Sequence, residues 1–271
     1  MISAILMAGY KNKMEVKRYS KIVAEHYGEK FIETGYLPLR EFKVVINGRD
    51  SPISPEVIQR FNVIKRKVKH NSIAGNFIKG YAASKACKDN KHALFVASDA
   101  PLTTREFIEQ FLMAAQKYQD RAAIILPATL IEASKDKLQR YPLKLLNDTE
   151  FDLPGTKDNY GRQGFRLSSV LTANPHLFDI NTANTAYSLR KALNPNVQLK
   201  LFKITRSLGY PNVYSKYFIR KDLSIKEVEN ITSAFFNGHL KLIPMAGEES
   251  TYDYDGTFFE YRMINEMLQN K

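Results

Sequence analysis

The chain has 271 residues, of which 44% are hydrophobic and 25% charged, and these proportions are typical of a globular protein with one large domain. No stretch approaches the roughly 18 uninterrupted apolar residues of a membrane span, no signal-peptide pattern opens the sequence, and the single cysteine, Cys87, excludes an internal disulfide. We therefore expect a cytoplasmic protein without a membrane segment, and the net charge of +12 favours an anionic partner such as a nucleotide, a phosphorylated metabolite, RNA or an acidic protein.

Strand and helix signals alternate through the first half of the chain. Short apolar runs predict strands at residues 3–7, 43–46, 61–64, 93–97 and 122–126. Helical spacing and capping residues predict helices that begin near residues 14, 54, 72 and 103. The last of these has a capping box made by Thr103 and Glu106. This alternation is typical of an α/β fold with a mainly parallel, doubly wound sheet of Rossmann-like type.

The pattern becomes irregular after Pro127. Residues 128–165 are polar, and a long loop inside a compact domain is often a binding loop. The rest of the sequence predicts a strand at 167–172, a helix at 183–193, a strand or helix edge at 199–204, a helix capped by Ser224 with Glu227, and a closing amphipathic helix that ends near residue 268. No linker divides the chain cleanly, so we expect a single domain over residues 1–271.

Several common functional signatures are absent from the sequence. It contains no G-x-x-x-x-G-K-[ST] phosphate loop, no G-x-G-x-x-G, no H-E-x-x-H, no paired C-x-x-C and no G-x-S-x-G turn. The five histidines are scattered, which does not favour a zinc site. These absences argue against the usual nucleotide-hydrolysing enzymes and dehydrogenases.

Two stretches that are far apart in the chain carry most of the functional signal. Residues 2–13 read as a buried strand that enters a small-residue turn, and Lys11 and Lys13 follow this turn. Residues 93–104 read as a second buried strand, with Asp99 just beyond its end. In an open α/β sheet, ligands bind beyond the carboxyl ends of the strands. A cationic loop and a carboxylate that meet there could hold a nucleoside triphosphate and its metal ion.

Four sequence blocks, in this order and spacing, resemble the nucleotidyltransferases of the nucleoside-diphospho-sugar transferase fold. Residues 4–13 match the first strand and its Gly-rich loop, and 98–101 match a strand end with a small residue, Asp, any residue and Pro. Residues 160–170 match a basic aromatic loop that enters a later strand, and 253–256 match an alternating-acid motif. Within this fold, the sequence looks closest to proteins similar to the molybdenum cofactor guanylyltransferase.

The sequence departs from that family pattern at four places. Ala8-Gly9 stands where the family has two adjacent glycines, and Lys13 stands for the usual arginine. Tyr36 lies where a lysine is expected after the first helix, and Ser168-Ser169 lies where Gly-Asn is common. These differences bear on activity more than on the fold.

The resemblance implies that an oxygen of an acceptor attacks the α-phosphate of an NTP and releases pyrophosphate. Such a transfer needs positioning and charge neutralisation more than a covalent nucleophile. The implied catalytic residues are Lys13 and Asp99, and Asp99 would bind Mg²⁺ together with Asp253 or Asp255. The implied nucleotide-binding residues are Ala8, Gly9, Tyr10, Lys11, Lys13, Ser72, Asn76 and Ser98.

The second half of the chain would then bind the acceptor. The resemblance implies a nucleotide-binding half over residues 1–127 and an acceptor-binding half, with the closing helix, over 128–271. Arg162, Arg166 and Ser169 are the candidates for a small phosphorylated or hydroxyl acceptor, because a guanidinium fork suits phosphate oxygens. Each candidate also has an ordinary structural interpretation, such as a solvated loop for the arginines and lysines or a helix cap for Ser72 and one of the C-terminal acids.

Two other functions remain open from the sequence. One is a glycosyltransferase of the same fold, in which Asp253-x-Asp255 would be the metal motif; the C-terminal position of this motif disfavours it. The other is a non-catalytic nucleotide- or RNA-binding protein on this scaffold, which would bind RNA in a salt-sensitive way and release no pyrophosphate. We therefore expect a Mg²⁺-dependent nucleotidyltransferase, with nucleic acid as a less favoured partner.

Overall fold

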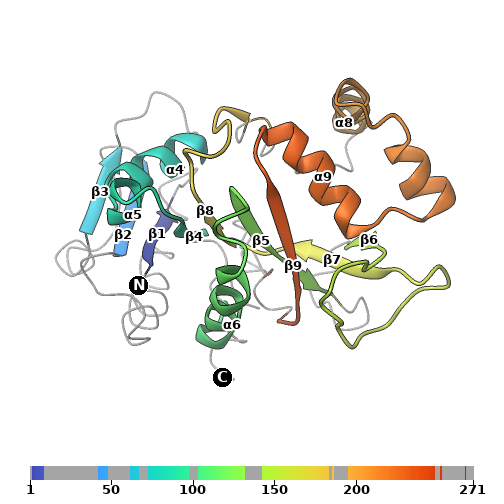
Figure 1. Ribbon diagram of the computed structural model, residues 1–271, viewed down its shortest axis with the longest axis horizontal. Helices are drawn as coiled ribbons and strands as arrows, with labels where there is room; N and C mark the ends of the chain where they lie inside the picture. The colour runs from blue at the N-terminus through green and yellow to red at the C-terminus, as the bar shows by residue number, and fades with distance from the viewer. Residues whose placement is uncertain are drawn as a thin grey trace.

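The computed structural model describes residues 2–8, 42–47, 62–66, 73–97, 103–131, 142–182, 185, 195–247, 251 and 266. Its centre is a nine-stranded sheet with the order β3-β2-β1-β4-β8-β5-β7-β6, and β9 pairs with β5 outside this path (Figure 1). Among the described strands, β7 and β8 run opposite to all the others. The predicted α/β fold with a mainly parallel sheet is therefore confirmed.

The first four strands form the parallel half of the sheet. They are β1 (Ser3–Ala8), β2 (Phe42–Asn47), β3 (Asn62–Arg66) and β4 (Ala93–Ala97), and the sequence predicted all four of them. The chain moves outward from β1 through β2 to β3 and then crosses back, so that β4 pairs with the other side of β1. The order of the strands therefore reverses between β1 and β4, which makes this a topological switch point.

The second half of the sheet is mixed and differs from the sequence-based prediction. It contains β5 (Ile124–Leu130), β6 (Leu143–Leu145), β7 (Gln163–Leu167), β8 (Val170–Ala173) and β9 (Leu240–Met245). The stretch predicted as irregular thus holds the end of β5, all of β6 and most of β7. The predicted strand at 167–172 is divided between β7 and β8, and β9 was not predicted.

A two-residue bulge at Ser168 and Ser169 separates β7 from β8. Both strands pair with β5: Leu167 lies opposite Ala128, and Thr172 lies opposite Ile125. The four positions from Ala128 back to Ile125 on β5 therefore lie opposite the six positions from Leu167 to Thr172, and the two surplus residues form the bulge. Pro127 of β5 lies opposite this interruption, so the missing proline N–H breaks no ladder bond, and β5 continues past it.

Six helices are described around the sheet: α4 (Ile73–Ala82), α5 (Lys85–Lys88), α6 (Arg105–Gln116), α8 (Pro195–Ser207), the π-helix η3 (Ser215–Arg220) and α9 (Ile225–Phe236). The predicted capping box of Ser224 and Glu227 is present at α9. At α6 the prediction was wrong by one residue, because Thr104 caps the helix by accepting from the Phe107 amide. The segment 199–204, which was predicted as a strand or a helix edge, lies inside the helix α8. The helices predicted near residues 14 and 54, the closing helix except residue 266, and all of 183–193 except residue 185 lie outside the described residues.

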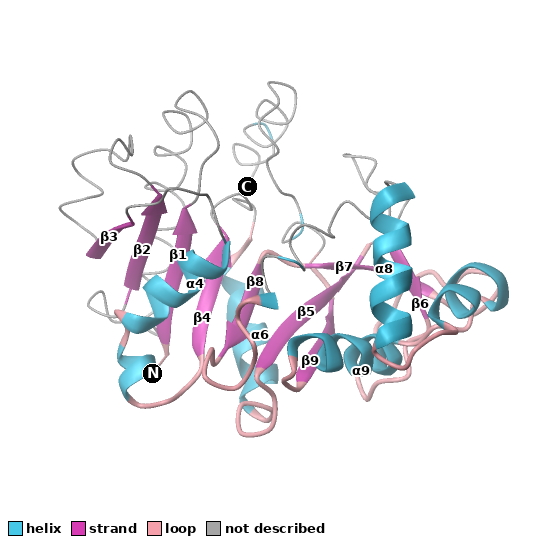
Figure 2. Ribbon diagram, turned by 90° about the horizontal axis from the view of Figure 1, so that it is seen from above, coloured by secondary structure: helices cyan, strands magenta, loops and turns pink. Residues whose placement is uncertain are grey.

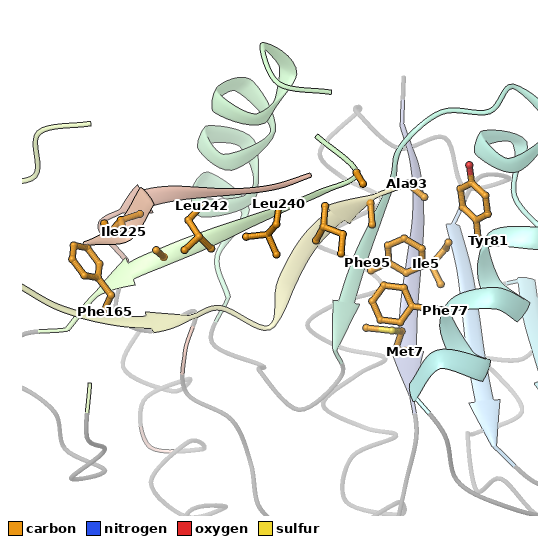
Figure 3. Packing of buried hydrophobic residues seen from close by; sticks show 14 of the residues in the cluster. Ile5, Met7, Phe77, Tyr81, Ala93, Phe95, Phe165, Ile225, Leu240 and Leu242 are labelled. Carbon is orange, nitrogen blue, oxygen red and sulfur yellow. The ribbon is translucent and has the colours of Figure 1, made fainter. Parts of the chain in front are cut away.

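One hydrophobic core runs along the sheet. In the parallel half, Phe77 of α4 stacks on Phe95 of β4 with ring centroids 4.3 Å apart, next to Ile5 and Met7 of β1 (Figure 3). At the other end, the core joins β7, β9 and α9 through Phe165, Leu240, Leu242 and Ile225. Within the part of the chain that the structure describes, no helix is long and apolar enough to cross a membrane.

Candidate functional site

The carboxyl ends of β1 and β4 lie side by side at the switch point. Met7, near the end of β1, pairs with Ala97, the last residue of β4. Figure 2 shows β1 and β2 directed toward the same edge of the sheet. In the sequence, the loop 9–13 follows β1 directly, and Asp99 comes two residues after Ala97. The two functional stretches of the sequence therefore leave the sheet at neighbouring positions.

The bulge between β7 and β8 lies at the same edge. The amide of Ala97 donates a hydrogen bond of 2.8 Å to the carbonyl of Ser169. Ser168 is buried, its hydroxyl accepts from the Val170 amide at 3.3 Å, and its own amide donates to the carbonyl of Pro127 at 3.2 Å. The structure thus brings Ser169, a predicted acceptor-binding residue, to the end of the strand that precedes Asp99.

Helix α4 connects β3 with β4 and packs against β1, β2 and β3. Because it follows the carboxyl end of β3, its amino end lies toward the same edge of the sheet as the switch point. The amino end of a helix attracts anions through its free N–H groups and its dipole. Asn76 lies in the first turn of α4 and is buried, with 4% of its surface exposed. Ser72, the predicted cap, lies just outside the described residues.

The two candidate arginines have different surroundings. Arg162 is held in a tight turn, where its Nη2 lies 2.8 Å from Oδ2 of Asp158 and its amide donates to Oδ1 of the same carboxylate at 3.0 Å. Desolvation raises the pKa of Asp158, but the hydrogen bonds from Arg162 and from the Tyr160 amide outweigh it and hold this pKa below its ordinary value. Arg166 lies in β7 opposite Thr129 of β5.

The chain that follows β9 leads toward α6. Gly247 has a φ of +111°, and a Cβ atom at this position would lie 2.7 Å from the ring of Phe107. Thr251 is fully buried a few residues later. Phe107 belongs to α6, the first helix after Asp99, and Thr251 precedes the Asp253-x-Asp255 pair in the sequence. Phe107, which follows Asp99 in the sequence, and Gly247, which precedes the Asp253-x-Asp255 pair, therefore lie close to each other.

The central residues of the predicted site lie outside the described residues. These are Gly9, Tyr10, Lys11, Lys13, Ser72, Ser98, Asp99, Asp253 and Asp255. Within the described ranges, no three His, Cys, Asp or Glu side chains are grouped so that they could hold a metal ion. The geometry that bears on the site comes from its flanking residues Met7, Ala97, Ser169 and Gly247.

Sequence reasoning missed the role of β9 in this arrangement. β9 pairs in parallel with β5 over its whole length and ends at Met245, two residues before Gly247. The available signal was the apolar run from Leu240 to Met245, but Lys241 and Pro244 interrupt it.

Comparison with known proteins supports the fold. No family model and no curated protein matches the chain. Among solved structures, it is similar to a hypothetical transferase from Thermus thermophilus, with 16% identity and a TM-score of 0.60 over 94% of this chain and 97% of that one.

Two further solved structures match this chain over nearly its full length and over nearly their own full length. 4-Diphosphocytidyl-2C-methyl-D-erythritol synthase from Anaerococcus prevotii is 14% identical, with a TM-score of 0.53 over 99% of this chain and 98% of that chain. CMP:2-keto-3-deoxy-manno-octonic acid synthetase, solved with CTP, is 10% identical, with a TM-score of 0.51 over 100% of this chain and 99% of that chain. The protein therefore has the nucleotide-diphospho-sugar transferase fold that the sequence resemblance implied.

Proposed function

We propose that the protein is a cytoplasmic, Mg²⁺-dependent nucleotidyltransferase that transfers an NMP from an NTP to a phosphorylated or hydroxyl acceptor and releases pyrophosphate. The pairing of Met7 with Ala97 carries this proposal, because the cationic loop and Asp99 follow these two adjacent strand ends in the sequence. This crevice is where open α/β sheets bind nucleotides. Within the fold, the four sequence blocks favour a relative of the molybdenum cofactor guanylyltransferase.

The donor residues of the site suit magnesium. Mg²⁺ prefers oxygen ligands, keeps several waters and needs one or two carboxylates in addition to the phosphates. Asp99 with Asp253 or Asp255 would supply these carboxylates, and the packing of Gly247 against Phe107 supports their approach. When bound, the ion would neutralise charge on the phosphates. The backbone at Ala8 and Gly9 would approach the phosphates closely, and Lys11 and Lys13 would balance their remaining charge.

The acceptor would lie on the side of β7 and β8. Ser169 is supported by its hydrogen bond to Ala97, and Arg166 lies three residues before it in the sequence. Arg162 would have to exchange its carboxylate partner Asp158 for the acceptor's phosphate. Two of the similar structures have names that include a cytidine nucleotide, so we include CTP among the donors to be tested.

The proposal is tested by thermal unfolding in the presence of each NTP, with and without Mg²⁺. A ligand that binds only the native state at about one hundred times its Kd stabilises it by about 2.7 kcal/mol. We expect one or two NTPs to raise Tm with Mg²⁺ and to lose most of this effect without it. The variant Asp99→Asn should lose the Mg²⁺-dependent rise, whereas Asp152→Asn, with the same change in charge on an exposed side chain, should keep it.

A second assay addresses turnover. Pyrophosphate release would be followed with the stabilising NTP and a panel of sugar phosphates and polyols. We expect release with at least one acceptor and a loss of at least a hundredfold in Asp99→Asn, since removing one group that neutralises transition-state charge typically costs that much. An unchanged rate in this variant would reject the metal assignment, and the lack of any NTP effect on Tm would reject the function.

A further inference from the structure

The chain contains two long stretches that hold eight Lys and Arg residues each and no Asp or Glu, namely residues 57–88 and 180–221. Residues 180–221, which we call the basic segment, contain eight of the 40 Lys and Arg residues and none of the 28 Asp and Glu residues. The basic segment therefore has a net charge of +8. The described part of this segment includes α8 and η3, which lie at the end of the sheet opposite β3 (Figures 1 and 2).

Helix α8 carries a row of exposed cations. Lys200, Lys203 and Arg206 are spaced three residues apart, so they form one ridge on the helix surface. Within the described ranges, no carboxylate lies within ion-pair distance of these three side chains. By contrast, Lys216 and Arg220 of η3 are paired with Glu227 and Asp222. The ridge is therefore available to an anionic partner.

The π-helix η3, which contacts α8, adds exposed apolar side chains. Phe218 is 53% exposed and Ile219 is 77% exposed, and Arg220 and Lys221 follow them directly. Aromatic contacts join η3 to α8: Tyr214 lies 5.7 Å from Phe202 of α8 and 5.1 Å from Phe218, measured between ring centroids. Single π-helical turns are rare and occur frequently at functional sites.

A second exposed ring borders this surface. Tyr160 is 53% exposed, Lys221 lies over its ring at 4.2 Å from the centroid, and the same ammonium donates to its hydroxyl at 3.2 Å. Aromatic rings with a polar tip, flanked by Lys and Arg, are typical of segments that sit at the boundary between water and lipid.

We propose that α8 and η3 dock the protein on an anionic lipid surface. Lys200, Lys203 and Arg206 would contact the headgroups, and Phe218 and Ile219 would enter the interface. A second copy of this chain is disfavoured as the partner, because a symmetric contact would bring the unpaired cations of α8 on two copies together. Single-stranded RNA would use the cations and Phe218, but it would leave the highly exposed aliphatic Ile219 without a role. This inference is independent of the proposed function.

The test is co-sedimentation of the full chain with vesicles. Vesicles of phosphatidylcholine alone are compared with vesicles of equal parts phosphatidylcholine and phosphatidylglycerol, at about 0.1 M salt and at about 1 M salt, where the screening length falls roughly threefold. We expect binding only to the anionic vesicles at the lower salt. Each neutralised cation near the surface should lower the partition coefficient about fivefold, so Lys200→Ser/Lys203→Ser/Arg206→Ser should bind about a hundredfold more weakly.

Two matched controls separate location from net charge. Lys79→Ser/Lys88→Ser/Lys91→Ser removes the same charge from exposed positions in and near α4 and α5, and it should bind nearly as well as the wild type. Ile219→Ser should weaken binding severalfold, whereas Met113→Ser, at a 70% exposed position in α6, should not. Thermal unfolding would verify that each variant is folded, and Ile219→Ser tests the apolar contact without removing the ring of Phe218.

Five outcomes would overturn the proposal, four of them from the vesicle and sedimentation experiments. These four are the absence of binding to anionic vesicles, an equal loss in both triple variants, unchanged binding in Ile219→Ser, and sedimentation equilibrium showing a dimer that Ile219→Ser dissociates. Preferential binding of a single-stranded RNA oligonucleotide, with vesicles unable to compete, would also reject the lipid surface in favour of nucleic acid.

Discussion

The backbone amide of Ala97 donates a 2.8 Å hydrogen bond to the carbonyl of Ser169, although 72 positions separate the two residues in the chain. This bond is available because the bulge inserts two surplus residues between β7 and β8. Bulges redirect a strand and are frequent beside active sites. Here the bulge joins the end of β4, which leads to Asp99, to the strand pair that we propose for the acceptor.

The stacked pair of Phe77 and Phe95 links α4 to the sheet directly beneath the candidate site. Phe95 is fully buried, so Phe95→Ala should lower the free energy of unfolding by about 3–5 kcal/mol through lost burial and the cavity left behind. Phe77→Leu keeps most of the apolar volume and should cost less than about 1.5 kcal/mol. Urea unfolding followed by circular dichroism would measure both values. Equal losses in the two variants would contradict the assigned packing.

The parallel half of the sheet could be predicted from the sequence because its signals are local. β1 and β4 are short apolar runs, and the helix after Ser224 begins with a capping box that involves only neighbouring residues. The expectation that the loop after β1 and the acid after β4 belong together rested on the general behaviour of parallel strands. The register of Met7 with Ala97 shows that the ends of β1 and β4 are neighbours, and the joining of the loop with Asp99 stays a prediction.

The mixed half could not be predicted because its elements depend on contacts that are distant in sequence. β9 contains Lys241 and Pro244, which break its apolar pattern. Lys241 is acceptable there because Glu229 neutralises its charge. Pro244 is acceptable because, among the described strands, β9 pairs with β5 on one side only, and an edge strand tolerates a proline. The partition of one predicted strand into β7 and β8 likewise follows from the pairing with β5 and β4. No local pattern marks Ser168 and Ser169 as surplus.

Buried His92 should make stability depend on pH. Its Nε2 donates to the Ala122 carbonyl at 2.8 Å, and its Nδ1 is buried without a partner among the described residues. Burial lowers the pKa of His92 below its ordinary value of 6.5, because a proton on Nδ1 would lack both water and an acceptor. The unfolded chain therefore binds a proton that the folded protein does not. This contribution to stability is complete above pH 6.5 and is lost as the pH falls toward the folded pKa.

The size of this effect is limited to about 1.4 kcal/mol per pH unit for one group. Urea unfolding at pH 7 and pH 5 would measure it. We expect the loss between these pH values to be smaller in His92→Gln than in the wild type, whereas His176→Gln, which changes an exposed ring, should behave like the wild type. Equal pH dependence in His92→Gln and the wild type would show that His92 does not titrate in this window.

The ion pair of Lys241 with Glu229 should be coupled strongly. The Nζ and Oε1 atoms are 3.2 Å apart, both side chains are about nine-tenths buried, and Glu229 also accepts from the Leu242 amide at 2.7 Å. Lys241→Met leaves a buried carboxylate without its cation and should cost about 3–5 kcal/mol. Lys241→Met/Glu229→Gln removes that charge, keeps the acceptor for Leu242, and should recover most of the loss. A double-mutant cycle by urea unfolding gives the coupling, and strictly additive losses would contradict it.

Gly247 should tolerate no side chain, because two separate constraints meet there. Its φ of +111° lies in a region that L-residues rarely adopt, and a Cβ atom would lie 2.7 Å from the ring of Phe107. Gly209 provides a matched control, since its φ is +87° and nothing lies within 4 Å of the corresponding position. Backbone strain of this kind costs about 1–3 kcal/mol, so Gly209→Ala should lose about that much. Gly247→Ala should lose clearly more, because α6 and the end of β9 must also separate. Equal losses of stability in both variants would show that backbone strain alone acts at this position.

The same two variants also test the candidate site. If the Mg²⁺-dependent stabilisation by NTP falls in Gly247→Ala but not in Gly209→Ala, the packing of Gly247 on Phe107 sets the approach of the C-terminal acids to Asp99.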